Sequence, residues 1–154
     1  MQQLEYGLKT FEMSVLMTPD KANFTGHVHG GDLLKYMDQV AYACATRYCG
    51  EYVVTLSVDK VLFKYPIEVG QLVSFLATVN YTGNSSMEVG IKVISEDIKN
   101  RIVQHTNSCY FTMVAIDENK KPTKVPKLEL ITEDDKRRYE SAKLRKSLRI
   151  SNKI

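Results

Sequence analysis

Apolar and polar residues alternate in four segments of the chain. These segments cover residues 11–17, 72–82, 87–93 and 103–116. A period of two is typical of β-strands that bury one face. A fifth segment, residues 52–64, is rich in Val, Leu and Phe and is followed by Pro66, so we expect a strand there as well. Gly83-Asn84 and Lys99-Asn100 separate the last three strands, which indicates hairpins.

The apolar period changes to that of a helix after Gly30-Gly31. Apolar residues then recur at helical spacing at Leu33, Leu34, Met37, Val40, Ala41, Cys44, Ala45 and Tyr48. Gly50 follows directly and is a helix stop signal. The pattern predicts one long helix with a broad apolar face.

A second helix, of charged character, is predicted near the end of the chain. Thr132-Glu-Asp-Asp135 has the arrangement of a capping box, and the charged pattern continues to about Arg149. The resulting order, β-α-β-β-β-β followed by a C-terminal helix, belongs to the α+β class. Because the first helix is apolar over a wide face, we expect an antiparallel sheet to curve around it. A single sheet covers only one side of that helix, so the pattern also predicts a homodimer.

Length and composition favour one ordinary globular domain. The chain has 154 residues, of which 44% are hydrophobic and 25% are charged. No run approaches the roughly eighteen apolar residues of a membrane span, and the sequence MQQLEYGLKTFEM lacks the basic start and apolar block of a signal peptide. We therefore expect a cytoplasmic protein without a membrane span.

The cysteines and the charge distribution exclude some functions and leave others open. The three cysteines lack metal-finger spacing, and Cys44 and Cys109 lie in apolar patterns, so we expect reduced core thiols. A net charge of +3 is too weak to imply nucleic acid. The end of the chain is nevertheless basic, either as a solvated helix face or as a docking surface for phosphates. Its basic residues are Lys136, Arg137, Arg138, Lys143, Arg145, Lys146, Arg149 and Lys153.

The stretch NFTGHVHGGDLLKYMD, residues 23–38, holds the candidate chemistry. Gly30-Gly31 lies where irregular chain becomes helix, and the first turn of a helix offers unpaired N–H groups and a positive dipole end. The doublet either polarises a carbonyl there or simply allows a tight turn. Asp38 lies at the margin of the apolar helix face, where it is a candidate general base or nucleophile or a surface acid paired with Lys35. The amide of Asn23 is a candidate for holding a water or a carbonyl oxygen.

The histidines give little support for a metal site. His27 and His29 are two residues apart and point the same way in extended chain, but no further His or Cys has ligand spacing. We therefore expect no metal, and a carbonyl-facing or chain-fixing role for both. The chain also lacks a G-x-S-x-G nucleophile motif and a phosphate-binding P-loop.

The segment NFTGHVHGGDLLKYMDQVAYACATRYC resembles the signature of hotdog-fold acyl-CoA thioesterases of the YciA-type and brain acyl-CoA hydrolase group. The later segment TLSVDKVLFKYPIEVGQLVSFLATVNYTGNSSMEVGIKV resembles the strands that hold coenzyme A in these enzymes. The resemblance covers about residues 8–126, a hotdog domain, and leaves residues 127–154 as a basic helical tail. It implies an antiparallel sheet wrapped around a long helix, dimers with a continuous sheet, and often a hexamer made of three dimers.

The resemblance also implies hydrolysis of acyl-CoA to a carboxylic acid and CoA. By position, Asp38 matches the catalytic acid, Asn23 the catalytic amide, and Gly31 with Gly30 the turn that polarises the thioester carbonyl. Asn23 and Asp38 would meet across a dimer. No cofactor is implied, because CoA is part of the substrate. The implied CoA contacts come from the turn with Asn84, Ser85 and Ser86, with Lys60, Lys64 and the basic tail as phosphate partners.

Two other functions fit the same scaffold. A hotdog-fold hydratase would pair an Asp with a His, and Asp20 or Asp32 near His27 could supply such a pair. A non-catalytic acyl-CoA-binding protein would bind the ligand without turnover, and Asp38 would then have no role.

Overall fold

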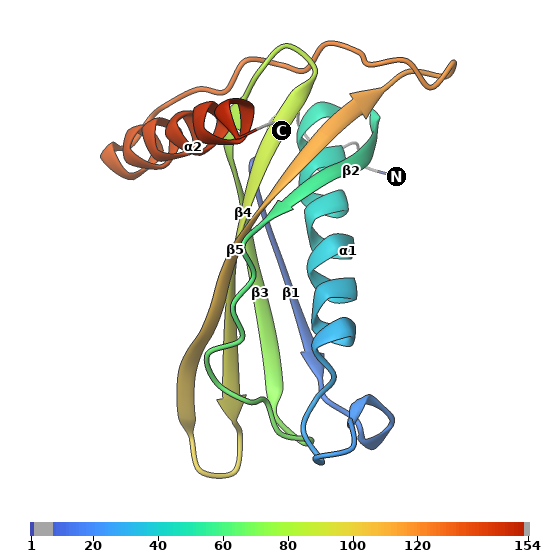
Figure 1. Cartoon of the computed structure of the whole chain (residues 1–154), viewed down its shortest axis with the longest axis vertical. Helices are drawn as coiled ribbons and strands as arrows, with labels where there is room; N and C mark the ends of the chain where they lie inside the picture. The colour runs from blue at the N-terminus through green and yellow to red at the C-terminus, as the bar shows by residue number, and fades with distance from the viewer. Residues whose placement is uncertain (2–7, 153–154) are drawn as a thin grey trace.

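The structure is a computed structural model that describes Met1 and residues 8–152. Five strands form one antiparallel sheet, and two long helices pack against it (Figure 1). In chain order the elements are β1 (Thr10–Leu16), a single 3-10 turn (Pro19–Lys21), α1 (Gly30–Cys49), β2 (Tyr52–Asp59), β3 (Leu72–Thr82), β4 (Ser86–Asp97), β5 (Ile102–Ile116) and α2 (Glu133–Ser151). The strands lie in the order β1-β3-β4-β5-β2. The predicted α+β order is confirmed.

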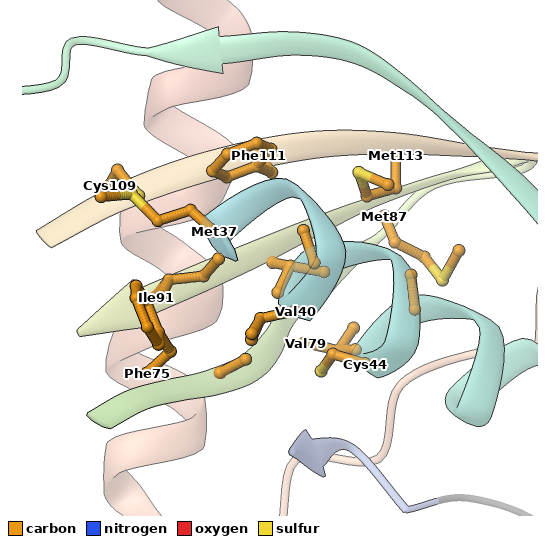
Figure 2. Close-up of a cluster of buried hydrophobic side chains, with 14 of the residues drawn as sticks. Met37, Val40, Cys44, Phe75, Val79, Met87, Ile91, Cys109, Phe111 and Met113 are labelled. Atoms are coloured by element: carbon orange, nitrogen blue, oxygen red, sulfur yellow. The ribbon is translucent and has the colours of Figure 1, made fainter. Parts of the chain in front are cut away.

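Helix α1 lies along the concave side of the sheet, and the core fills the space between them (Figures 1 and 2). The alternating apolar residues of β3, β4 and β5 point toward α1 and are almost completely buried, as the period predicts. One exception is Tyr81, which follows a β-bulge and lies against Tyr139 of α2. Figure 2 shows this layer: Met37, Val40, Cys44, Phe75, Val79, Met87, Ile91, Cys109, Phe111 and Met113. Helix α1 ends where the sequence predicts, because Gly50 adopts a left-handed φ of 73° and its N–H donates to the carbonyl of Thr46.

The predicted strand over residues 52–64 is wrong in its second half. β2 pairs with β5 only as far as Asp59, which lies opposite Tyr110, and the next residues leave the sheet. Val61 instead packs against the core, and the ring of Phe63 lies against the start of α1. The apolar run therefore continues past the strand because its side chains cover the helix rather than a sheet face.

Helix α2 packs on the opposite face of the sheet from α1 (Figure 1). Its N-terminus has the predicted capping box, in which Thr132 and Asp135 bond to each other's backbone N–H. Ala142 is fully buried, and the rings of Tyr139 and Tyr81 lie 4.9 Å apart. The described part of the predicted tail is therefore docked on the sheet, whereas Lys153 lies outside the described residues.

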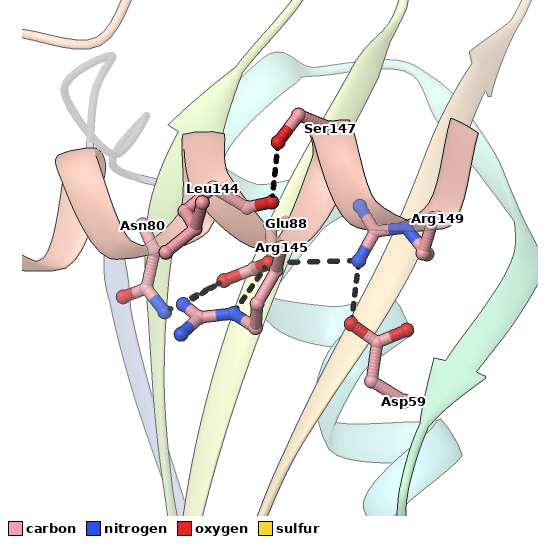
Figure 3. A network of polar contacts seen from close by, with 7 residues as sticks. All are labelled: Asp59, Asn80, Glu88, Leu144, Arg145, Ser147 and Arg149. Carbon is pink, nitrogen blue, oxygen red and sulfur yellow. Dashed lines mark hydrogen bonds and ion pairs between the residues drawn. The ribbon is translucent and has the colours of Figure 1, made fainter. Parts of the chain in front are cut away.

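A buried ionic network fixes α2 to the sheet (Figure 3). Glu88 of β4 is only 2% exposed, and the guanidinium of Arg145 donates to both of its carboxylate oxygens, at 2.6 and 3.1 Å. Arg149 pairs with Asp59 at the end of β2, at 2.5 Å. A buried carboxylate is costly unless it is paired and hydrogen-bonded. Two of the basic residues in the tail therefore have a structural role.

The cysteines behave as predicted. Cys44, Cys49 and Cys109 are free and buried. Burial raises the pKa of the Cys44 and Cys109 thiols to about 12, so they stay in the unreactive protonated form at neutral pH. Within residues 8–152, neither helix is long and apolar enough to cross a membrane.

Candidate active site

The two glycines at the start of α1 differ in their surroundings. A Cβ at Gly30 would lie 3.3 Å from the ring of Phe63, so close packing explains the absence of a side chain there. A Cβ at Gly31 would have no atom within 4 Å, and Gly31 is exposed. In the described part of the chain, the N–H groups of both glycines lack a protein acceptor. Gly31 therefore presents an open, unpaired helix N-terminus.

Asp38 projects from α1 toward the edge strand β2. Its Oδ1 accepts a hydrogen bond of 2.6 Å from the hydroxyl of Thr55. The alternative prediction is an ion pair between Asp38 and Lys35. No such ion pair forms among the described residues. The bond holds one carboxylate oxygen and leaves the other, on an exposed residue, available for chemistry.

The side chain of Asn23 is oriented by its own loop. Its Oδ1 accepts from the N–H and the hydroxyl of Thr25, at 2.8 and 2.7 Å, and from the N–H of His27 at 3.3 Å. Since three donors converge on one atom, that atom must be the amide oxygen. The amide NH₂ has no acceptor among the described residues. Asn23 thus offers a hydrogen-bond donor.

One chain does not bring all the catalytic candidates together. Asn23 lies before the start of α1 near the two glycines, whereas Asp38 is eight residues beyond Gly30, or about 12 Å along the helix axis. No hydrogen bond joins Asn23 to Asp38 within the described residues. The chain therefore carries two partial sites, one at the beginning of α1 and one at Asp38 and Thr55.

The residues predicted to contact CoA lie in two separate places. Asn84 and Ser85 lie in the β3–β4 turn, and Ser86 begins β4 opposite Val114 of β5, which in turn pairs with Val54 in the first half of β2. Lys60 and Lys64 are exposed and follow the other end of β2. The two lysines therefore lie at the opposite end of β2 from the strand positions that are level with the turn.

A lysine of α2 lies beside the turn instead. A Cβ on Gly83 would be 2.9 Å from Oγ of Ser86 and 3.0 Å from Nζ of Lys146, so these two polar groups flank the turn. Lys146 also lies over the ring of Tyr81. A cleft of about 540 Å³ opens here, lined among others by Ser86, Lys146 and Arg149.

The histidines form no metal site. Within residues 8–152, no group of three or more His, Cys, Asp or Glu side chains is arranged to hold a metal ion. His27 contacts Thr25 and Glu68, at 2.9 Å each, which fits the predicted chain-fixing role. Asp20 contacts Thr18 and Lys21, so the aspartate–histidine pair of the hydratase alternative does not involve it.

Sequence reasoning missed Thr55 and Glu68. Thr55 is one threonine in a strand and is selected only because β2 lies beside α1. Glu68 reaches His27 only because an isolated antiparallel bridge pairs their backbones. Neither relation has a local sequence signal.

A curved antiparallel sheet around one long helix, with an open N-terminus and an acid on that helix, defines a hotdog-fold protein. The thioesterase superfamily matches residues 25–102, and the chain belongs to this family. Protein VdlD of Helicobacter pylori is 62% identical over 137 residues, which cover 89% of this chain and 78% of VdlD.

Solved structures agree with this membership. A hexameric acyl-CoA thioesterase, crystallised without ligand, aligns with a TM-score of 0.90 and 36% identity over 95% of each chain. An acyl-CoA hydrolase from Staphylococcus aureus, in complex with butyryl coenzyme A and coenzyme A, aligns with a TM-score of 0.83 and 32% identity over 94% of this chain and 90% of that one.

Three alanine variants of the S. aureus enzyme have also been crystallised, each replacing one polar residue. The replaced asparagine and aspartate are 15 positions apart, and the replaced threonine follows 17 positions later. The same intervals separate Asn23, Asp38 and Thr55 in this chain.

Proposed function

We propose that this protein is an acyl-CoA thioesterase, which hydrolyses acyl-CoA to a carboxylic acid and CoA. The observation that carries the proposal is the hydrogen bond between Thr55 and Asp38, together with an Asn23 whose amide NH₂ is free. The spacing of these three residues equals that of the residues replaced in the S. aureus hydrolase. Family membership and the hydrolase names of the structural neighbours support the same reaction.

Asp38 supplies the base or the nucleophile in this proposal. As a base, its free carboxylate oxygen takes a proton from water while the water oxygen attacks the thioester carbonyl carbon. As a nucleophile, the same oxygen attacks directly and forms an anhydride that water then hydrolyses. In both routes the C–S bond breaks and CoA leaves as a thiol. Thr55 fixes the carboxylate through the other oxygen.

Asn23 and Gly31 supply the stabilisation of the oxyanion. Because the oxygen of the Asn23 amide is occupied, this residue acts as a donor to the carbonyl oxygen rather than as an acceptor for water. The unpaired N–H at Gly31 and the positive end of α1 provide further donors. Preorganised donors of this kind act on the charge that develops in the transition state.

A second copy of the chain completes the site. β2 is an edge strand that exposes a row of apolar side chains, with Tyr52 at 71% and Leu56 at 68% exposure. Such an edge is suited to pairing with another strand. Pairing two copies through β2 would extend the sheet and bring Asn23 of one protomer to Asp38 of the other. The hexameric neighbour supports further assembly into a trimer of dimers.

The cleft between α2 and the β3–β4 turn is the proposed place for the phosphates of CoA. Lys146 and the hydroxyl of Ser86 offer a cation and a donor there, and charge-assisted bonds suit phosphate oxygens. Asn84 and Ser85 belong to the same turn, whereas Lys60 and Lys64 remain candidates for a CoA bound by the partner protomer. Gly30, the first residue of α1, offers a further unpaired N–H. In this proposal the reaction needs no cofactor, because CoA is part of the substrate. The protein would act in the cytoplasm.

The test is release of free thiol from a panel of acyl-CoAs from acetyl to palmitoyl. The wild type should release thiol, and Asp38→Asn should lower kcat by about 10²–10⁴-fold because it removes the base or nucleophile. Binding of acyl-CoA and the thermal midpoint should change little, since Asp38 is exposed. Lys35→Gln, which alters the neighbouring charge that does not pair with Asp38, is the matched control and should stay active. Binding without turnover by the wild type would favour the acyl-CoA-binding alternative, and hydration of an enoyl-CoA without thiol release would favour the hydratase.

A further inference from the structure

The loop that holds Asn23 continues through a chain of side-chain hydrogen bonds to a glutamate. The hydroxyl of Thr25 lies between Oδ1 of Asn23, at 2.7 Å, and Nδ1 of His27, at 2.9 Å. On the other side of the ring, Nε2 of His27 lies 2.9 Å from Oε1 of Glu68. An antiparallel bridge between the backbones of His27 and Glu68, with the Val28 N–H donating to the Ile67 carbonyl, fixes the ring beside the carboxylate.

Counting hydrogens along this chain assigns a donor to each contact of His27. The Asn23 oxygen only accepts, so the single hydroxyl hydrogen of Thr25 is given to it. The contact between Thr25 and Nδ1 then requires a hydrogen on Nδ1. An ionised carboxylate also only accepts, so the contact with Glu68 requires a hydrogen on Nε2. Both ring nitrogens then act as donors, which is the hydrogen pattern of an imidazolium.

We propose that His27, held as an imidazolium by Glu68, is a positioning residue for Asn23. This inference rests on the proposed function, in which the Asn23 amide donates to the substrate carbonyl. A neutral ring has one hydrogen and one lone pair, so one of its two contacts must fail. If the lone pair is on Nδ1, it competes for the hydroxyl hydrogen that Thr25 gives to Asn23; if it is on Nε2, it faces the Glu68 carboxylate.

Few charged side chains lie near His27 in the described structure. Glu68 is the charged side chain paired with it in the described structure, and Lys21, on the adjoining segment, pairs with Asp20. The side chains of His27 and Glu68 are 36% and 52% exposed, and neither belongs to the core. Substitutions here should therefore leave the fold intact.

The pH dependence of thioester hydrolysis tests the proposal. In the wild type, kcat should fall when rising pH removes the second ring hydrogen of His27. His27→Gln should lower kcat by about 3- to 10-fold and abolish that fall, because one amide cannot serve both Thr25 and Glu68. Thr25→Val should lower kcat similarly, whereas Thr25→Ser, which keeps the hydroxyl, should restore it. His105→Gln, on β5, is the control and should match the wild type, because the His105 ring contacts Asn107 and Ser108 instead.

Glu68→Gln separates this proposal from a simple charge effect. The glutamine amide can donate to Nε2, so a neutral His27 with its hydrogen on Nδ1 satisfies every contact. We expect this variant to stay active as the pH rises, without the fall seen in the wild type. If loss of the carboxylate merely made His27 easier to deprotonate, the fall would move to lower pH. That result, or a wild type and His27→Gln with equal kcat at all pH values, would overturn the proposal.

A measurement that needs no turnover keeps the two proposals distinguishable. In protein labelled with ¹⁵N-histidine, the ring signals missing from His27→Gln identify this residue among the three histidines. Both ring nitrogens should be protonated wherever kcat is maximal, and a neutral ring there would refute the inference. If the wild type hydrolyses no acyl-CoA, the proposed function fails, while the ring signals still decide whether the hydrogen-bonded imidazolium exists.

Discussion

Thr55 is the residue whose role follows most directly from the geometry. Its hydroxyl donates to Asp38 at 2.6 Å, and a bond to a charged group contributes more than a neutral one. Thr55→Val keeps the shape and removes the donor, so kcat should fall by about 10- to 100-fold. Thr55→Ser keeps the donor and should retain most of the activity. Comparing kcat and the thermal midpoint of both variants checks this, and equal rates would show that Asp38 does not depend on Thr55.

Gly31 allows the helix N-terminus to be tested separately from folding. A side chain at this position meets no atom within 4 Å in the chain itself, so Gly31→Val should fold normally. The branched side chain would, however, cover the N–H groups proposed to face the substrate carbonyl. We expect kcat to drop by at least about 100-fold, as for the loss of an oxyanion donor. Gly31→Ala should be affected less, and a fully active valine variant would remove Gly31 from the site.

The sequence could name Asn23, Gly31 and Asp38 because they share one short stretch with a readable change from loop to helix. It could not name their partners. Thr55 and Glu68 acquire their meaning from β2 beside α1 and from a backbone bridge between two loops, and both contacts are tertiary. Even the role of the Asn23 amide as a donor depends on hydrogen bonds that occupy its oxygen within a folded loop.

At the scale of elements, periodicity predicted well wherever one face is buried. β3 has the predicted bounds, and α1 ends at the predicted glycine. β2 ends early although β5 continues to Ile102, because the chain leaves the sheet after Asp59 and places Val61 against the core and Phe63 against the start of α1. The charge pattern of α2 indicated a helix but could not indicate that Arg145 bonds to the buried Glu88 of β4.

The N-terminus of α2 gives a prediction that depends on pH. The carboxylate of Asp135 accepts from the N–H groups of Thr132 and Ile131 and pairs with Lys9 at 2.6 Å. The bond from Lys9 and these N–H groups hold the pKa of Asp135 well below its usual 3.8. A lowered pKa in the folded state stabilises the protein above pH 3.8, and this contribution is lost as the pH falls toward the folded value.

Asp135→Asn should therefore destabilise the protein by about 1–2 kcal/mol at pH 7, and the difference from wild type should shrink below about pH 4. Urea unfolding at pH 7, 4 and 3 measures this. Asp134→Asn is the control, because Asp134 is exposed and pairs with Arg137 on the surface, where an ion pair contributes about 0.5 kcal/mol. A difference for Asp135→Asn that stays constant with pH would contradict the role of its charge.

The two partial sites of a single chain are consistent with a site that is shared between two copies. Asn23 and Gly31 lie at one end of α1, Asp38 and Thr55 lie farther along it, and the exposed apolar row of β2 borders the second pair. A two-fold pairing through β2 places the same surface of both copies in contact, so each interface would build two equivalent sites. Neither residue pair would then be complete without the partner.

Mixing two inactive variants tests this shared site. Asn23→Ala and Asp38→Asn proteins, each nearly inactive alone, are combined in equal amounts and allowed to exchange subunits. Each mixed dimer has one site with both substitutions and one site with neither. Random exchange makes half of the dimers mixed, so activity should return to about a quarter of the wild-type value, if sites act independently and dimers form without preference. Two Asp38→Asn preparations treated identically should show no recovery. Exchange proven by mass-tagged subunits without any return of activity would show that each chain builds its site alone.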